Sequence, residues 1–391
     1  MLNNSARLFY LDDIPTPYRV GVFRRVAELW EGEFRVAFCA EAEPGRSFEI
    51  DLAGLDTRVL RGFQWRPLGQ TNPFSFKWNP GVVAELEAFK PDIVILSGYA
   101  HPTMLRAALW CLANRIPYAV ACETSARSTA IKGPRWQLRQ SVAGWMIRNM
   151  AFGLPVGNEA ASYLRMFGTD AQMYAFPNTP DTGPFEAAAA RFEAGEASEE
   201  VRRRYGLSSE APLFVFVGRL ISAKRSLDAI AAIRNLPKEI PACLLIVGDG
   251  PQAEVARELA LDDPRIAFAG WVNDQSKLAA IFAEASVLIL PSAHEPWGAV
   301  VNEAMAARTS IIATDRVGAA VELVSDGQEG FLVSVGDVSA ITEAIATLAG
   351  DSALRSQMGA NAQIRAVACG AEFAACNLIA GACAALCSKT N

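Results

Sequence analysis

Residues 286–306 read SVLILPSAHEPWGAVVNEAMA, and this stretch decides the expected fold. Its opening, residues 286–290, is a short apolar run that stops at a proline. That pattern predicts a strand buried on both faces of a parallel sheet. Pro296 and Gly298 then predict a loop, and residues 299–306 have the composition of a helix. A buried strand followed by a loop and a helix is the repeating unit of an α/β domain.

Two glutamates of this stretch are the leading functional candidates. Glu295 lies in the expected loop and Glu303 in the expected helix. Ligands of open α/β sheets collect at the carboxyl ends of strands, where carboxylates accept hydrogen bonds from vicinal hydroxyls and helix-start amides attract anions. A sugar joined to a nucleotide by a diphosphate offers both kinds of group. Alternatively, both glutamates are solvated residues that the helix dipole favours.

The same alternation of strand and helix runs through the whole chain, so we expect two doubly wound parallel-sheet α/β domains. The expected strands are residues 7–11, 34–39, 92–97, 118–122 and 173–176 in the first half, and residues 213–217, 244–247, 266–268, 287–290 and 310–313 in the second. A turn-rich passage, residues 177–184, separates the halves. We therefore expect domains at residues 1–180 and 206–370, with residues 181–205 as a linker.

Composition narrows the functional class. The chain has 391 residues, 51% of them hydrophobic, and a net charge of −6, which gives no general reason to expect a nucleic-acid partner. The first residues lack a signal-peptide pattern, so we expect a cytoplasmic protein. Its eight cysteines include no C-x-x-C pair and fit reduced thiols better than disulfides or zinc ligands. Residues 374–387 are apolar but shorter than the roughly 20 residues that span a bilayer.

Two further motifs follow strands of the second half. Gly218 and Arg219 end one strand and Lys224 follows shortly after, which places two cations where a diphosphate could be neutralised. The alternative is a pair of solvated surface cations. Residues 248–253 read GDGPQA and match the G-x-G-x-x-A form of a dinucleotide fingerprint, which supports a rival function. The proline in this block and its place after the second strand of its domain weaken that match.

Taken together, these blocks resemble the retaining glycosyltransferases of family 4, which have the two-domain GT-B fold. The resemblance is carried by residues 213–220 with Lys224, residues 245–251, residues 269–272, the glutamate pair, and residues 330–333. It implies two Rossmann-like domains facing a cleft, with the acceptor bound by the first domain and a nucleotide-sugar donor by the second. It also implies that a final helix, about residues 371–391, packs back on the first domain.

The resemblance assigns roles to the donor-site residues. Glu295 would hold sugar hydroxyls and Arg219 and Lys224 the diphosphate, as the catalytic set. The remaining donor contacts would come from Glu303 at the ribose, the turns at Gly218 and Gly250, the backbone near Val272 and Asn273 at the base, and the backbone of Trp297, Gly298 and Ala299. No metal or other cofactor is required, and a UDP- or GDP-sugar is expected. Arg225 and Arg308 depart from the family, which commonly has glycine at both positions.

The first half offers weaker candidates. Glu123 stands where many relatives have a histidine, and either contacts the sugar or acceptor or is an ordinary loop residue. His101 follows another strand end, with a structural role as its alternative. Arg19 lies in the loop before the first helix, where it would reach donor phosphates or an acidic acceptor. The pair Asp12 and Asp13 fits a turn better than a metal site.

A basic segment follows Glu123. Residues 124–158 contain no acid, whereas Arg127, Lys132, Arg135, Arg139 and Arg148 interleave with apolar residues. Such a segment suits peripheral contact with anionic lipid at the inner face of the membrane, or with a lipid-linked acceptor. A solvated helix face with an ordinary core side is the alternative.

The sequence thus predicts a retaining glycosyltransferase of the hexosyltransferase type. It would move a sugar from a nucleoside-diphosphate donor to a hydroxyl of a saccharide or lipid-linked saccharide, in assembly of a cell-envelope or exported polysaccharide. Three rivals remain: a sugar-nucleotide epimerase or phosphorylase on the same fold, a nicotinamide-dependent oxidoreductase built on Gly248 and Gly250, and a non-enzymatic sugar-binding protein.

Overall fold

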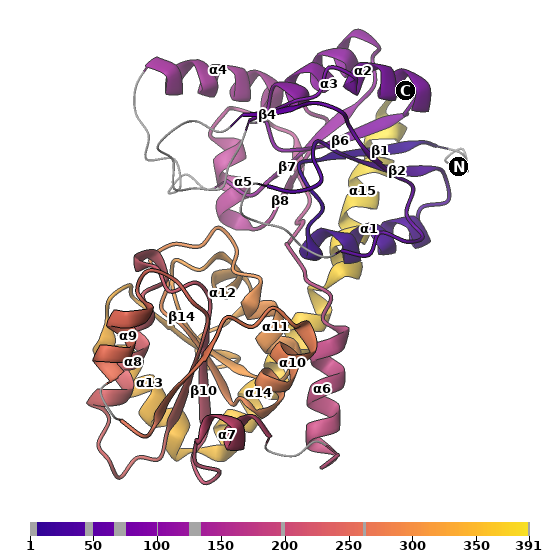
Figure 1. The fold of residues 1–391 in the computed structure, drawn as a ribbon. Coiled ribbons are helices and arrows are strands. Elements are labelled where there is room, and N and C mark those ends of the chain that lie inside the picture. The colour runs from indigo at the N-terminus through magenta and orange to yellow at the C-terminus, as the bar shows by residue number, and fades with distance from the viewer. Residues whose placement is uncertain are drawn as a thin grey trace. The chain divides into compact units, whose positions relative to one another are not determined.

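The chain forms two compact units in the computed structural model (Figure 1). Unit 1 comprises Met1–Pro180 with Ala371–Asn391, and unit 2 comprises Asp181–Gly370. The structure describes residues 6–43, 50–65, 76–99, 101–124, 134–196, 200–260 and 263–389, without the side chains of residues 134–139 and 389.

Unit 1 is built on a seven-stranded sheet of order β3-β2-β1-β6-β7-β8-β9, with every neighbouring pair parallel. The strands are β1 (Leu8–Asp12), β2 (Phe34–Phe38), β3 (Thr57–Val59), β6 (Ile93–Ser97), β7 (Tyr118–Cys122), β8 (Phe152–Pro155) and β9 (Gln172–Met173). The helices are α1 (Pro17–Leu29), α2 (Val82–Phe89), α3 (Pro102–Ala113), α4 (Pro134–Arg148), α5 (Asn158–Arg165) and α15 (Ala371–Lys389). A separate antiparallel ribbon pairs β4 (Phe63–Trp65) with β5 (Phe76–Trp78).

The last helix, α15, completes the core of unit 1. It packs against α1 and β8 and buries Ala374, Leu378 and Ala382. By length and composition, Ser352–Ser388 is the one helical stretch of the described chain that could cross a membrane. Core packing accounts for the apolar face of its α15 part, because that face is already removed from water inside unit 1.

Unit 2 has a six-stranded parallel sheet of order β12-β11-β10-β13-β14-β15. Its strands are β10 (Leu213–Val217), β11 (Cys243–Val247), β12 (Ile266–Gly270), β13 (Val287–Leu290), β14 (Ser310–Thr314) and β15 (Gly330–Val333). Its helices are α6 (Gly183–Glu193), α7 (Glu200–Tyr205), η2 (Ser222–Lys224), α8 (Ser226–Asn235), α9 (Ala253–Ala260), α10 (Gln275–Glu284), α11 (Val300–Ala306), α12 (Gly318–Leu323), α13 (Val338–Gly350) and α14 (Ser352–Ala368). The predicted fold class, two parallel-sheet α/β domains, is confirmed.

Residues 181–205 differ from the expected linker, because their helices pack on unit 2. The Phe185 ring of α6 lies 6.0 Å from the Phe282 ring of α10. Glu284 at the end of α10 accepts hydrogen bonds from the amides of Val201 and Arg202, at 2.8 and 3.2 Å, and so caps α7. Helices α6 and α7 are therefore an integral part of unit 2.

Each sheet reverses its strand order at one place. In unit 2 the first strand, β10, lies between β11 and β13, and in unit 1 β1 lies between β2 and β6. At such a switch point the loops leave in opposite directions, and a crevice opens outside the carboxyl ends of the two central strands. The loops after β10 and β13, and those after β1 and β6, are therefore where each unit should bind ligands.

Candidate functional site

A salt bridge spans the switch point of unit 2. Lys224, in the loop after β10, pairs through its Nζ with Oε1 of Glu295, in the loop after β13. Their side chains are 20% and 10% exposed, so both are largely removed from water yet still reach it. The Ser292 hydroxyl donates a further hydrogen bond to Glu295 Oε1 at 2.9 Å. The sequence-predicted cation and carboxylate thus meet at the expected crevice.

The backbone around Glu295 is fixed by the neighbouring loop after β14. The Glu295 amide donates to the Arg316 carbonyl at 2.9 Å, and the Gly318 amide donates to the Glu295 carbonyl at 3.1 Å. Gly298 has φ +92°, and a Cβ there would lie 3.0 Å from Val317 Cγ1. The left-handed backbone therefore favours glycine at position 298, and a Cβ there would be in tight contact with Val317.

The two glycines of the G-x-G-x-x-A block serve loop packing. Gly248 has φ +143°, and a Cβ on it would lie 1.8 Å from the Gly218 carbonyl oxygen. The Leu220 amide donates to the Asp249 carbonyl at 2.8 Å, and a Cβ on Gly250 would lie 2.6 Å from the Leu220 carbonyl oxygen. The loops after β10 and β11 thus touch through their backbones, which accounts for the glycines without a bound dinucleotide.

Two of the predicted donor-site residues, Arg219 and Glu303, have no side-chain partner within the described part of the chain. The Arg219 guanidinium is exposed, and the Glu303 carboxyl on α11 is half-buried. Because burial disfavours its charged form and no cation offsets this, the pKa of Glu303 is raised to about 8. An unpaired, desolvated carboxyl is costly for stability and is a common feature of binding sites.

The remaining predicted donor-site residues lie in the loops at the same sheet edge. Trp297 is buried and its Nε1 donates to Asn302 Oδ1 at 3.0 Å, so its side chain is part of the packing. The amides of Gly298 and Ala299 donate no hydrogen bond within the described residues. Val272, half-buried, and Asn273, exposed, follow β12 directly. These amides and the exposed backbone are available to a ligand.

Arg225 and Arg308, which stand where the family commonly has glycine, both have a left-handed backbone. Arg225 has φ +51° and Arg308 has φ +63°. This conformation costs L-residues energy, which explains why glycine is common there. Each arginine makes an ion pair in return, Arg225 with Asp228 at 2.7 Å and Arg308 with Glu193 at 2.9 Å.

Ser292 and Asn302 are site residues that sequence reasoning missed. Ser292 orients Glu295, and Asn302 holds the Trp297 indole. Their positions within the motif, three residues before Glu295 and one before Glu303, were the available signal.

In unit 1, Arg19 and Glu123 lie together. The Arg19 guanidinium is buried, donates to the carbonyls of Phe176 and Pro177 at 3.2 and 3.3 Å, and lies 4.1 Å from the centre of the Phe176 ring. Glu123 is 54% exposed and pairs with Arg19 at 3.4 Å. Arg19 therefore tethers the segment after β9. Its predicted phosphate contact, and the role of Glu123, stay predictions.

His101 belongs to a buried ionic network at the switch point of unit 1. Its Nδ1 accepts from the Lys77 amide at 3.2 Å, which leaves Nε2 to donate to Asp13 Oδ1 at 2.9 Å. Lys77, fully buried, pairs with Asp13 at 2.8 Å and with Glu43. Burial acts to raise the pKa of Asp13, but the hydrogen bond from His101 and the charge of Lys77 outweigh it and lower that pKa. These contacts give His101 a structural function, and its catalytic role stays a prediction.

The basic segment is described only in part. Arg127 and Lys132 lie outside the described residues, and Arg135 and Arg139 stand on α4. Arg148 is exposed and donates to the Phe167 carbonyl at 3.3 Å. Within the described residues, no group of three His, Cys, Asp or Glu side chains could hold a metal ion.

Comparison with known proteins agrees with this geometry. Residues 197–365 match the family model described as glycosyl transferases group 1. N-acetyl-alpha-D-glucosaminyl L-malate synthase of Bacillus anthracis is 30% identical over 168 residues, which are 42% of this chain and 43% of that protein. Sulfoquinovosyl transferase SQD2 of Arabidopsis thaliana is 27% identical over 315 residues, which are 75% of this chain and 56% of that protein. The chain thus spans about half the length of these curated relatives.

Solved structures establish the fold. The crystal structure of Anabaena Alr3699/HepE in complex with UDP aligns with a TM-score of 0.69 over 97% of this chain and 99% of that one, at 18% identity. At that identity the likeness concerns the fold alone. The chain has the GT-B fold, and residues 197–365 of its second unit match the model of the group 1 glycosyl transferases.

Proposed function

We propose that this protein is a retaining glycosyltransferase, of the hexosyltransferase type, that uses a nucleoside-diphosphate-sugar donor. The observation that carries the proposal is the Lys224–Glu295 pair across the switch point of unit 2, flanked by the unpartnered Arg219 and Glu303. Cations for a diphosphate and carboxylates for hydroxyls are the groups that such a donor requires. The nucleotide is UDP or GDP, in keeping with the UDP bound in the Anabaena structure.

Each side chain has a role in the proposed complex. Arg219 and Lys224 neutralise the diphosphate, while Glu295, released from Lys224, accepts hydrogen bonds from sugar hydroxyls. Glu303 contacts the ribose hydroxyls. This contact supplies the hydrogen-bond partner that its carboxyl lacks, so donor binding offsets part of the cost of its burial.

The proposed chemistry retains the configuration of the anomeric carbon. The bond from that carbon to the diphosphate oxygen breaks, and its electron pair leaves with the diphosphate. An acceptor hydroxyl oxygen bonds to the same face of the carbon, and its proton passes to the departing diphosphate. The cations of unit 2 stabilise the charge that develops on the leaving group, so no glutamate acts as a nucleophile and no metal ion is required.

We assign the acceptor to a saccharide or lipid-linked saccharide, in assembly of a cell-envelope or exported polysaccharide. We place the reaction in the cytoplasm. Support comes from the resemblance to family 4 transferases, among which this is a frequent task of bacterial members, and from the basic segment of residues 124–158.

A thermal-shift screen tests the donor class first. A ligand that binds only the folded state raises the melting temperature, so UDP, GDP, ADP, dTDP and NAD(P) are compared at equal concentrations. We expect selective stabilisation by UDP or GDP. Stabilisation by NAD(P) alone would indicate an oxidoreductase and contradict the proposal of a transferase.

Variants then test the site. Lys224→Ala and Glu303→Ala should each weaken binding of the stabilising nucleotide at least tenfold. Lys277→Ala and Glu343→Ala are the matched controls, because these are exposed residues of unit 2. Isothermal titration gives each affinity. If both site variants bound the nucleotide as tightly as the wild type, the assignment of Lys224 and Glu303 to the donor site would be wrong.

A further inference from the structure

The β4–β5 ribbon exposes one aromatic face. Phe63 pairs with Trp78 and Trp65 with Phe76 across the ribbon. Because successive side chains of a strand point to opposite faces, these four rings share one side. Phe63, Trp65 and Trp78 are 74%, 63% and 40% exposed. Large aromatic side chains normally bury most of their surface, so this concentration marks an interaction surface.

The opposite face of the ribbon is anchored by charge. Lys77 lies on that face, is fully buried, and makes the ion pairs with Asp13 and Glu43 described above. Its amide is bonded to His101 at the start of α3. The ribbon is thus attached to unit 1 through the face that carries Lys77, which leaves the aromatic face directed outward.

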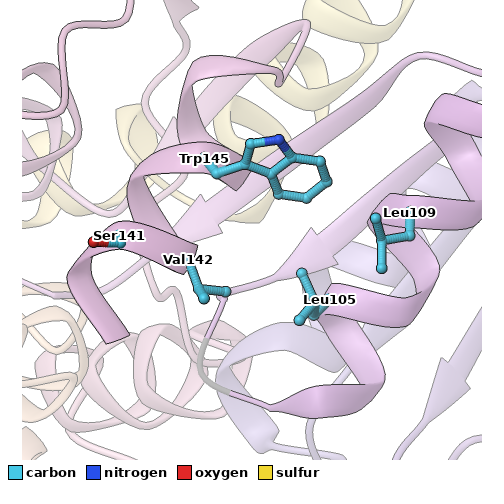
Figure 2. A pocket seen from close by; sticks show the side chains of 5 residues that line it. All are labelled: Leu105, Leu109, Ser141, Val142 and Trp145. Atoms are coloured by element: carbon cyan, nitrogen blue, oxygen red, sulfur yellow. The ribbon is translucent and has the colours of Figure 1, made fainter. Parts of the chain in front are cut away.

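Apolar exposure continues from the ribbon along α3 to α4. The Arg106 guanidinium of α3 lies 5.5 Å from the centre of the Trp78 ring, and α3 also exposes Leu109 and Leu112. Between α3 and α4 lies an open groove of about 350 Å³, lined by Leu105, Leu109, Ser141, Val142 and Trp145 (Figure 2). Figure 2 shows the two leucines on one helix and Val142 with Trp145 on the other.

The segments that build this surface are strongly basic. Together, β4, β5, α3 and α4 contain five lysines and arginines and no acid, in a chain whose net charge is −6. Among those whose side chains the structure describes, Lys77 is buried, Arg106 is half-buried and Arg148 is exposed. The surface therefore combines exposed rings and leucines with cations, and the elements that build it contain no acid.

We infer that the β4–β5 ribbon, α3 and α4 form a docking surface for an anionic lipid bilayer. Aromatic side chains favour the bilayer interface, leucines insert among acyl chains, and arginines are attracted to anionic headgroups. A soluble saccharide would instead require carboxylates or amides among the rings, and the segments here supply cations. This inference does not rest on the proposed activity, because a bilayer is recognised by this surface alone.

Flotation of the full chain with lipid vesicles tests the inference. We expect binding to vesicles of 30% phosphatidylglycerol in phosphatidylcholine, and binding at least tenfold weaker to pure phosphatidylcholine. Raising NaCl from 0.1 to 0.5 M should weaken binding severalfold, because salt screens the headgroup attraction. Equal binding to neutral and anionic vesicles, or none to either, would overturn it.

Variants locate the contact. F63S with W65S should lower the affinity for anionic vesicles at least tenfold while the melting temperature stays near that of the wild type, since both rings are exposed. Ile364→Ser is the control, because Ile364 is 70% exposed on α14 of unit 2. A double variant that binds vesicles like the wild type would refute the assignment. The assignment would also be refuted if the double variant lost binding to a soluble oligosaccharide but kept binding to vesicles. The ribbon would then be an acceptor site.

Discussion

The two units have the same strand order at their switch points, but the side chains at these two places interact differently. In unit 2 the loops after β10 and β13 carry one salt bridge that still reaches water, glycine-lined backbone contacts, and the unpaired Arg219 and Glu303. In unit 1 the loops after β1 and β6 are joined by the buried network of Asp13, Lys77 and His101. The ion pair at the switch point of unit 2 still reaches water, whereas the cation at the switch point of unit 1, Lys77, is fully buried.

This difference distinguishes the candidate binding site of unit 2 from a buried structural network on the same topology. Polar groups that are already paired and buried stabilise the fold, whereas unpaired or partly solvated groups can exchange their partners for a ligand. The shared strand order therefore does not make the two places equivalent. Their side chains decide which one binds.

Replacing each lysine by methionine should give the largest difference. Lys77→Met removes the buried cation that pairs with both Asp13 and Glu43, and removing one partner of a buried pair costs about 3–5 kcal/mol. Lys224→Met should cost less, about 1–2 kcal/mol, because this pair reaches water and Glu295 keeps the Ser292 hydrogen bond. Urea unfolding followed by circular dichroism measures both.

Nucleotide binding should show the reverse order. Lys224→Met should lose the stabilisation by nucleoside diphosphate, and Lys77→Met should keep it in whatever fraction is folded. Equal stability losses in the two variants would mean that the switch points do not differ as described.

A second test uses the raised pKa of Glu303. Because its pKa is about 8 in the folded protein and 4.5 in the reference state, the folded form holds a proton that the unfolded chain has released between these pH values. Stability should therefore fall as pH rises from about 4.5 to 8. One pKa unit corresponds to about 1.4 kcal/mol, so the loss is a few kcal/mol at most.

Glu303→Gln removes this titration. Its melting temperature relative to the wild type should rise between pH 5 and pH 8, whereas the exposed control Glu343→Gln should follow the wild type. Parallel curves for Glu303→Gln and the wild type would show that the carboxyl is not desolvated in solution.

Much of the sheet could be predicted from the sequence, because buried parallel strands leave apolar runs such as residues 213–217 and 287–290. Strand β8, with the sequence FGLP, was missed because glycine and proline are turn signals, and only pairing with β7 makes it a strand. The exposed β4–β5 ribbon has no buried apolar pattern to detect.

The candidate site, too, could be predicted from the sequence only in part. Lys224 and Glu295 could be proposed from residue type and from their place after strands, and the structure brings them together. The burial of Lys77 could not, because a lysine between two aromatic residues gives no sign of the carboxylates that meet it. Those partners are distant in the chain and are set by the tertiary fold.

The smallest effect concerns the two arginines with left-handed backbones in unit 2. At Arg308, φ is +63° and the guanidinium pairs with Glu193. Arg308→Ala removes the ion pair but keeps the energetic cost of the left-handed backbone. Arg308→Gly removes both the ion pair and that cost. The glycine variant should therefore be about 1 kcal/mol more stable than the alanine variant, the cost of this conformation for an L-residue. Differential unfolding in urea measures the gap, and an alanine variant as stable as the glycine variant would mean that position 308 relaxes out of the left-handed region. The exposed pair itself is worth about 0–1 kcal/mol, so Arg308→Gly should stay close to the wild type.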